Sequence, residues 1–196
     1  MADTALTPAR ILEAAEEVLR RYGPGKATVV DVARALGVSH GSVYRHFASK
    51  AALRDAVTER WLKGVSDPLA EIAAEDGPAA ERMHRWLTTL STAKQTMARQ
   101  EPELFATYVA LTMEAREVVA AHVDALAGQL ARIVADGVAQ GTFTAPAGHV
   151  AIGRAVLDAT SRFHNPAHAA EWSEPGLAES FEAVWALILS GLAVRP

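Results

Sequence analysis

The chain has 196 residues, of which half are hydrophobic, a formal net charge of −4 and no cysteine. This length and composition allow one or two domains with a large apolar core, and the lack of cysteine excludes disulfides, thiolate catalysis and zinc sites built on cysteine. Residues 1–4 have neither the basic start nor the apolar segment of a signal peptide, and no apolar run approaches the length of a membrane span. The sequence therefore predicts a cytoplasmic protein with no membrane partner.

The charges are unevenly distributed along the chain. Residues 1–63 carry ten Lys and Arg against seven Asp and Glu, whereas residues 64–196 carry nine against sixteen. A basic end beside an acidic remainder is expected when only one part of a protein meets phosphate. Chance unevenness in a small sample is the alternative.

The first predicted helix begins near Thr7 and Pro8, with the threonine as its cap and the proline in its first turn. Apolar residues then follow three and four apart until the breaker Gly23-Pro24-Gly25. They are Ile11, Leu12, Ala15, Val18, Leu19 and Tyr22.

Two short helices are predicted next. Thr28 and Asp31 have the spacing of a capping box, so a helix should begin at Val29. Gly37 stands where a left-handed residue ends a helix, and Ser39 can cap a second helix over about residues 40–47. The apolar positions of that second helix are Val43 and Phe47. Its outward positions are His40, Gly41, Ser42, Tyr44, Arg45 and His46.

This pattern is a helix-turn-helix, and its residues closely resemble the DNA-binding signature of the tetracycline-repressor (TetR) family of bacterial transcription factors. One departure is Ala51-Ala52, where the family commonly has acidic residues. The residues that carry the resemblance are Thr28, Asp31-Val32-Ala33, Gly37-Val38-Ser39, Gly41-Ser42, Tyr44, His46-Phe47 and Ser49-Lys50.

The resemblance implies a homodimer that reads two inverted half-sites of a palindromic operator in double-stranded DNA. Thr28, Tyr44, His46 and Lys50 match positions that usually contact phosphate. Ser39 caps the reading helix and Gly41 permits close approach. His40, Ser42 and Arg45 are the candidate base readers, with Arg45 suited to guanine or to a phosphate. Tyr44 packing on the fourth helix, and a purely local bond of His46, remain open.

A fourth helix over about residues 49–63 is predicted to link a DNA-binding domain (residues 1–50) to a ligand-binding and dimerisation domain (residues 64–196). Breakers separate five further helices, and no strand-like alternation is present, so the fold should be all-α. The predicted ranges are 78–100, 102–113, 114–140, 147–162 and 177–193.

The last two predicted helices have broad apolar surfaces that must be covered. In the TetR family the corresponding helices pair with their twins in a four-helix dimer interface. An internal core is the alternative. The predicted interface stripe is Phe181, Val184, Trp185, Ile188 and Leu189.

The resemblance also implies an effector pocket in the second domain that controls DNA binding. This pocket would lie away from the DNA-binding helix-turn-helix, which is called the reading head below. An apolar or aromatic ligand is expected because few charges accompany the candidate residues. Each candidate has the alternative of ordinary core packing. The candidates are Trp86, Leu90, Phe105, Tyr108, Met113, His122 and Phe163.

A metal site and catalysis are both disfavoured. His164 and His168 stand four apart near Glu171, with His149 upstream, but Asn165-Pro166 should interrupt the helix that would join the pair. The segment resembles a structural connector that pins the last helix with Trp172. No phosphate loop or nucleophile elbow is present. We therefore predict no metal, no cofactor and no enzymatic activity, and expect a ligand-released repressor. A ligand-independent regulator or an activator is the alternative.

Overall fold

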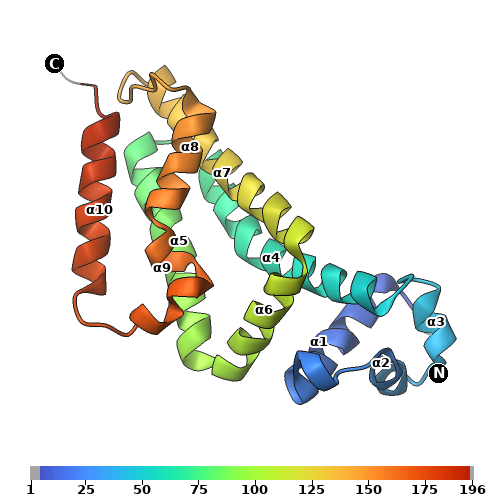
Figure 1. Ribbon diagram of the computed structural model, residues 1–196. Coiled ribbons are helices and arrows are strands. Elements are labelled where there is room, and N and C mark those ends of the chain that lie inside the picture. Colours follow the sequence, from blue (N-terminus) through green and yellow to red (C-terminus); the bar gives the residue numbers. More distant parts are fainter. Residues whose placement is uncertain (1–4, 195–196) are drawn as a thin grey trace. The chain divides into compact units, whose positions relative to one another are not determined.

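The computed structural model describes residues 5–194, so residues 1–4, on which the absence of a signal peptide was predicted, lie outside the described residues. The fold is all-α, as predicted (Figure 1). Within residues 5–194 the only extended pairing is an isolated bridge between Phe143 and Ala193. The elements are α1 (Pro8–Lys26), α2 (Val29–Leu36), α3 (His40–Tyr44), α4 (Lys50–Ala74), α5 (Ala79–Gln100), α6 (Pro102–Glu114), α7 (Arg116–Ala139), α8 (His149–Ala159), α9 (Ser161–His164), the 3-10 helix η1 (Pro166–Glu171) and α10 (Leu177–Leu192).

The chain packs as two compact units. Unit 1 contains the described residues up to Leu62 together with Glu101–Val119, and unit 2 contains Lys63–Gln100 and the residues from Ala120 onward. Helix α6 therefore belongs to the same unit as α1–α3 and packs against α1, although it lies far from them in sequence. The functional division at residues 50 and 64 stays a prediction.

Unit 1 is built around capped helices. The Thr7 side chain accepts a hydrogen bond from the Arg10 amide, and Pro8 opens α1. Gly23 has a φ of 71°, so the predicted breaker interrupts α1, and the helical run resumes as far as Lys26. The core of the unit joins residues from α1, α2, α3, α4 and α6. They include Ile11, Val18, Val32, Val43, Val57 and Leu111.

Helix α4 is longer than the sequence predicted. It continues past Lys63 and through Pro68 to Ala74. A proline normally disrupts a helix because it lacks an amide donor and crowds the preceding turn. Here Leu69 and Ala73, beyond the proline, are fully buried in the core of unit 2, and this burial holds the last turns in place.

Unit 2 is organised around α5 and α7. Trp86 and Leu90 of α5 are buried in one cluster with Leu130 and Ile133 of α7. The buried Arg82 of α5 also donates a hydrogen bond to Asp136 of α7 over 2.8 Å. The two helices are therefore joined by both apolar and ionic contacts.

The sequence-based statement that no apolar run could span a membrane is corrected by α7. This helix of 24 residues is long and apolar enough by length and composition, with one third of its most apolar window buried. A single such helix is weak evidence of a span, because a core helix has the same composition. Leu130, Ile133 and Val134 of α7 lie in the core of unit 2.

The predicted helix over residues 147–162 is divided in two. Helix α8 ends at Ala159 and α9 begins at Ser161. Between them Thr160 is buried, and its hydroxyl donates to the carbonyl of Val156 over 2.9 Å. A threonine that bonds back to the preceding turn commonly bends a helix.

Candidate nucleic-acid interface and ligand-domain core

Side-chain caps fix the start of α2 and the turn between α2 and α3, as predicted. The Thr28 amide donates to the Asp31 carboxylate over 3.1 Å, and the Asp31 amide donates to the Thr28 hydroxyl over 3.2 Å. Gly37 closes α2 with a φ of 68°, and Ser39 accepts a hydrogen bond from the Ser42 amide. These contacts set the direction in which α3 leaves the turn.

Helix α3 is shorter than the predicted range of 40–47. It ends at Tyr44 because Ser49 caps the next helix, accepting a bond from the Ala52 amide over 3.0 Å, so the chain must turn before it. Val43 is buried and Phe47 half-buried, which anchors α3 to unit 1 as predicted. The outward side chains are exposed apart from the half-buried Ser42. They are His40, Tyr44, Arg45 and His46.

A chain of hydroxyl contacts orients Arg45. The Ser39 and Ser42 hydroxyls lie 2.9 Å apart, and the Arg45 guanidinium donates to the Ser42 hydroxyl over 3.1 Å. Ser42 therefore engages Arg45 within the free protein. This geometry suits Ser42 to positioning the guanidinium at least as well as to reading a base itself.

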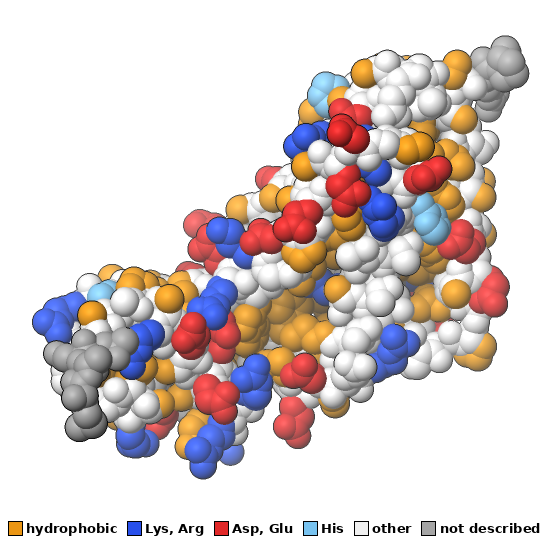
Figure 2. Space-filling view, turned by 180° about the vertical axis from the view of Figure 1, so that it is seen from behind, with side chains coloured by type: hydrophobic (Ala, Val, Ile, Leu, Met, Phe, Trp, Pro, Cys, Tyr) orange, Lys and Arg blue, Asp and Glu red, His pale blue; other side chains and the backbone are white. Residues whose placement is uncertain are grey.

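The predicted phosphate-contacting residues have different surroundings. The Thr28 hydroxyl is occupied by Asp31, and this hydrogen bond lowers the pKa of the Asp31 carboxyl. Tyr44 is exposed and makes an edge contact with the His40 ring. Lys50 is exposed at the start of α4. On the face drawn in Figure 2, Lys and Arg side chains spread over the end of unit 1 that carries the N-terminal helices.

The seven predicted effector-contacting residues are divided between the units. Trp86, Leu90, His122 and Phe163 belong to unit 2, and the other three belong to unit 1. Among those three, Met113 is 73% exposed, which contradicts a place in a buried pocket wall. Its position near the end of α6 turns it away from the core.

Tyr108 belongs to the same unit as the reading helices, which corrects the prediction that it lies in a remote domain. Its ring is buried and lies 6.4 Å from the Trp61 ring of α4 and 6.2 Å from the Phe105 ring, measured between centroids. Burial raises the pKa of the Tyr108 hydroxyl. This aromatic cluster connects α6 to α4.

A second contact joins α6 to the reading head. Arg54 of α4 donates to the Glu114 carboxylate over 2.7 Å and to the carbonyl of Pro24 over 2.8 Å. Sequence reasoning missed this link because the partners lie 60 and 30 residues apart. Arg54 therefore joins α6, α4 and the segment before α2 through side-chain contacts.

Unit 2 contains a buried lysine that the sequence analysis did not single out, together with the half-buried His122 and His164. Lys94 is 4% exposed, and burial lowers its pKa to about 8. Burial, then the nearby Lys94, lowers the pKa of His122 to about 4. Burial likewise lowers the pKa of His164 to about 4. The helical spacing indicates the burial of Lys94, because it falls four residues after Leu90 on the buried side of α5.

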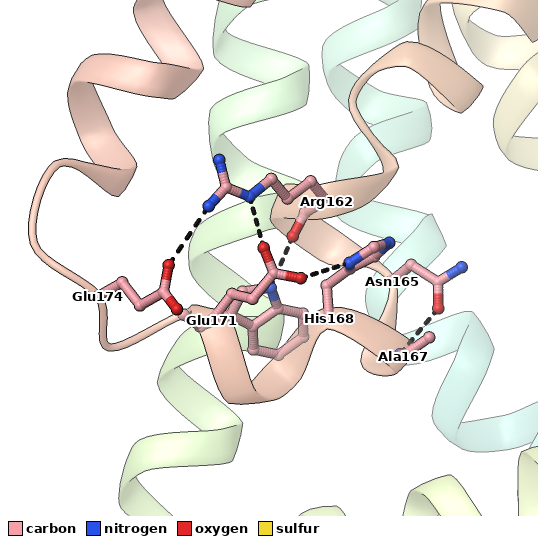
Figure 3. A network of polar contacts seen from close by, with 7 residues as sticks. Arg162, Asn165, Ala167, His168, Glu171 and Glu174 are labelled. Carbon is pink, nitrogen blue, oxygen red and sulfur yellow. Dashed lines mark hydrogen bonds and ion pairs between the residues drawn. The ribbon is translucent and has the colours of Figure 1, made fainter.

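The connector before α10 is held by polar contacts (Figure 3). Arg162 donates to Glu171 over 2.7 Å, and Glu171 also pairs with His168 over 2.8 Å. The buried Trp172 donates its indole N–H to the carbonyl of Arg162 over 2.8 Å. Within the described part of the chain no three His, Asp or Glu side chains are grouped to hold a metal, and His164 instead faces Thr160.

The apolar stripe on α10, which was predicted to form the dimer interface, packs largely against the core of unit 2. Phe181 is buried against Phe163, and Trp185 lies 5.2 Å from the His84 ring of α5. Val184, Ile188 and Leu189 are partly buried against the same core. The opposite side of α10 is exposed, with Leu187 at 74%. Val150 on α8 is 68% exposed.

Two protein families match this chain. Residues 11–57 match the family described as bacterial regulatory proteins, tetR family, and residues 79–185 match the tetracyclin repressor-like C-terminal domain. The chain belongs to the TetR family. It is thus a member of a family of DNA-binding transcriptional regulators, and its first matched segment contains α2 and α3.

Curated relatives are similar mainly over part of their length. A helix-turn-helix transcriptional regulator of Mycobacterium tuberculosis is 32% identical over 103 residues, covering 53% of this chain and 49% of the relative. TtgR of Pseudomonas putida is 40% identical over 70 residues, covering 36% of this chain and 33% of TtgR. The chain therefore matches about half or less of the length of these relatives.

Solved structures share the fold over nearly the whole chain. FadR of Thermus thermophilus, a repressor in complex with lauroyl-CoA, is 21% identical with a TM-score of 0.65, covering 97% of both chains. SmeT, the repressor of a Stenotrophomonas maltophilia multidrug efflux pump, is 18% identical with a TM-score of 0.64, covering 98% of this chain and 93% of SmeT. At these identities the likeness concerns the fold.

Proposed function

We propose that this TetR-family protein is a cytoplasmic repressor that binds a palindromic operator as a homodimer and is released by a small-molecule effector. The observation that carries the proposal is the outward surface of α3, where Arg45 is held by Ser42 while Tyr44 and His40 stay exposed. A short helix anchored by one buried valine and presenting polar side chains suits the major groove.

In this proposal Tyr44, His46 and Lys50 bind phosphates, and Thr28 contributes through the capped start of α2. Arg45 and His40 read base edges, with Ser42 fixing the guanidinium. Gly41 adds no side chain that would hold the helix away from the bases.

The outward faces of α8 and α10 are the proposed dimer surface. Val150 and Leu187 are large apolar side chains that stay exposed there. Small exposed residues surround them, which would let the helices of a second copy approach closely. They are Ala151, Ala155, Ala183, Ala186, Ser190 and Gly191.

DNA binding is tested by footprinting followed by titration of operator and random DNA at several salt concentrations. Lys50→Ala should weaken binding to both DNAs and lower the salt slope by about one unit. Arg45→Ala should cost about 1–3 kcal/mol on the operator and relax selectivity at one base pair per half-site. Equal losses of Arg45→Ala on operator and random DNA would rule out base reading by Arg45.

Release by an effector is supported by the contacts of α6 with the reading head. Tyr108 packs on Trp61, and Glu114 pairs with Arg54, so a ligand that displaces α6 would bias the position of α4. The structural neighbours named for lauroyl-CoA and for efflux repression are consistent with an apolar effector. An effector screen by operator release, repeated with Arg54→Ala, should show binding retained and release reduced.

A further inference from the structure

Three basic side chains of unit 2 gather between α5, α7 and α9. Lys94 of α5 is 4% exposed, whereas His122 of α7 and His164 of α9 are half-buried. Burial is the main cause of the low pKa of each histidine, and the charge of Lys94 adds to it. The three groups are therefore close enough to act on one another.

The pairing of α5 with α7 places Lys94 opposite His122. The buried ion pair described above joins the two helices, and one turn later on α5 the indole of Trp86 donates to Gln129, which lies earlier on α7, over 2.9 Å. The helices therefore run antiparallel. Lys94 follows Trp86 by eight residues and His122 precedes Gln129 by seven, which are similar rises of about 12 and 11 Å along the two helices. The two side chains consequently lie at the same level of the helix pair.

Helix α9 is held beside Lys94 by a separate contact. The Gln95 side chain donates to the carbonyl of Phe163 over 3.0 Å. The next residue, His164, has its Nε2 atom 3.3 Å from the carbonyl of Leu157. A carbonyl only accepts, so the neutral ring carries its proton on Nε2 and its Nδ1 is an acceptor. His164 is therefore unsuited to donate to an anion.

His122 is the member of the cluster that a ligand can reach. Within residues 5–194 its ring has no hydrogen-bond partner, and part of the residue stays accessible. A neutral imidazole offers one N–H donor. The covered Lys94 acts on a bound group through its charge, because charges in a protein interior are weakly screened.

The cluster carries one positive charge at neutral pH. Burial lowers the pKa of Lys94 to about 8, so its ammonium form prevails at pH 7, whereas both histidines, with a pKa of about 4, are neutral. An anion bound nearby lowers the cost of keeping this ammonium out of water. A carboxylate has the matching single charge, whereas a phosphate group with a charge near −2 exceeds it.

We propose that the cluster of Lys94, His122 and His164 binds the carboxylate of a small organic acid with an apolar body. The His122 N–H donates to a carboxylate oxygen, and the Lys94 ammonium balances the charge. An apolar body is inferred because the surroundings are otherwise apolar, with Leu90 and Leu126 one turn away in the core. The inference rests on the proposed function only in taking this acid as the effector, since all three basic residues belong to unit 2.

The test titrates the full chain without DNA with octanoate and octanamide, which share an apolar chain and differ in charge. At pH 7 octanoate should bind at least about 10-fold more tightly by calorimetry, because hydrogen bonds to charged groups are the stronger ones. Octanoate should also raise the pKa of His122, followed by NMR, because a carboxylate beside the ring favours the imidazolium. Equal affinities for the two probes, or an unchanged His122 pKa, would overturn the proposal.

Lys94→Met removes the charge and keeps an unbranched side chain, so it should abolish the preference for octanoate and leave octanamide binding unchanged. Lys63→Met, which changes an exposed lysine of the same unit, is the matched control and should retain the preference. An undiminished preference in Lys94→Met would assign the anion to another site.

Two substitutions of His122 give the answer even if Lys94→Met fails to fold. His122→Phe should weaken octanoate binding by about 3- to 10-fold, as expected for one hydrogen bond, and His122→Gln, which keeps an N–H donor, should bind more tightly than His122→Phe. Equal octanoate binding by wild type and His122→Phe would contradict the proposed contact. Operator titrations of these variants without octanoate report separately on the proposed repressor, because no residue of the reading head is changed.

Discussion

The helices of the reading head in unit 1 and the helix α10 in unit 2 are oriented by different kinds of contact. In the head, short-range hydrogen bonds from Thr28, Asp31 and Ser39 fix the helices, so each cap is visible in the sequence. In α10 the apolar residues surround most of the helix, and no side chain caps its start. The direction in which α10 faces is decided by what packs against it. Local polar motifs therefore specify orientation where apolar patterns leave it ambiguous.

The largest expected effect comes from the outward face of α10. Leu187→Glu should place a charge in the dimer contact, produce monomers and weaken operator binding by about 10²–10⁴-fold, because the two heads no longer bind as one. Sedimentation and circular dichroism check the assembly and the helical content. Val138→Glu changes an exposed apolar residue of α7 and is the control. A dimeric Leu187→Glu protein would place the interface elsewhere and remove the contrast between the two faces of α10.

The close packing of α7 and α8 gives the next effect. A Cβ atom at Gly153 would lie 2.5 Å from the Ala131 backbone nitrogen, so Gly153→Ala should destabilise the protein by about 1–3 kcal/mol. Gly128, also helical, has no atom within 4 Å of such a Cβ, so Gly128→Ala should stabilise by about 0.5–1 kcal/mol. Urea denaturation of both variants measures the difference. If both substitutions change the stability in the same direction, α7 and α8 can separate without cost.

Acid should weaken unit 2 through its half-buried histidines. The pKa of His164 is about 4 in the folded protein and near 6.5 in its ordinary state, so below about pH 6.5 the unfolded chain binds a proton that the folded chain does not. Stability should therefore fall as the pH drops from about 6.5 to 4. His122 adds in the same direction. Lys94, with a pKa of about 8, stays protonated in this window and adds no slope.

His164→Asn should reduce the loss of stability between pH 7 and pH 5 by about 1–2 kcal/mol, measured by denaturant titration at constant ionic strength. The exposed His149→Asn is the control. The same acid sensitivity in His164→Asn and wild type would show that this histidine is not held neutral by burial.

The smallest effect tests the serine contact in the head. Ser42→Ala frees the Arg45 guanidinium and should weaken operator binding by about 3- to 10-fold, as expected for one lost hydrogen bond. The salt slope should not change because no phosphate ligand is removed. Fluorescence anisotropy on operator and random DNA measures both quantities. A loss on random DNA of equal size would assign Ser42 to the backbone instead.

The helical class, the starts of α1, α2 and α3, and the outward side chains of α3 could all be predicted from the residues alone. These features depend on contacts between residues about three apart, as between Thr28 and Asp31 or Ser39 and Ser42. The helix bounds in unit 2 were also close, because breakers such as Gly77-Pro78 and Gly141 are local signals.

The contacts that those helices make depend instead on long-range packing. Burial of Leu69 and Ala73 carried α4 beyond Pro68, packing on Trp61 placed Tyr108 in unit 1, and the core of unit 2 turned Phe181 and Trp185 inward. Lys94 and Ser91 of α5 are buried in the folded chain. An apolar pattern states that a face must be covered, whereas the surface that covers it is selected by long-range packing.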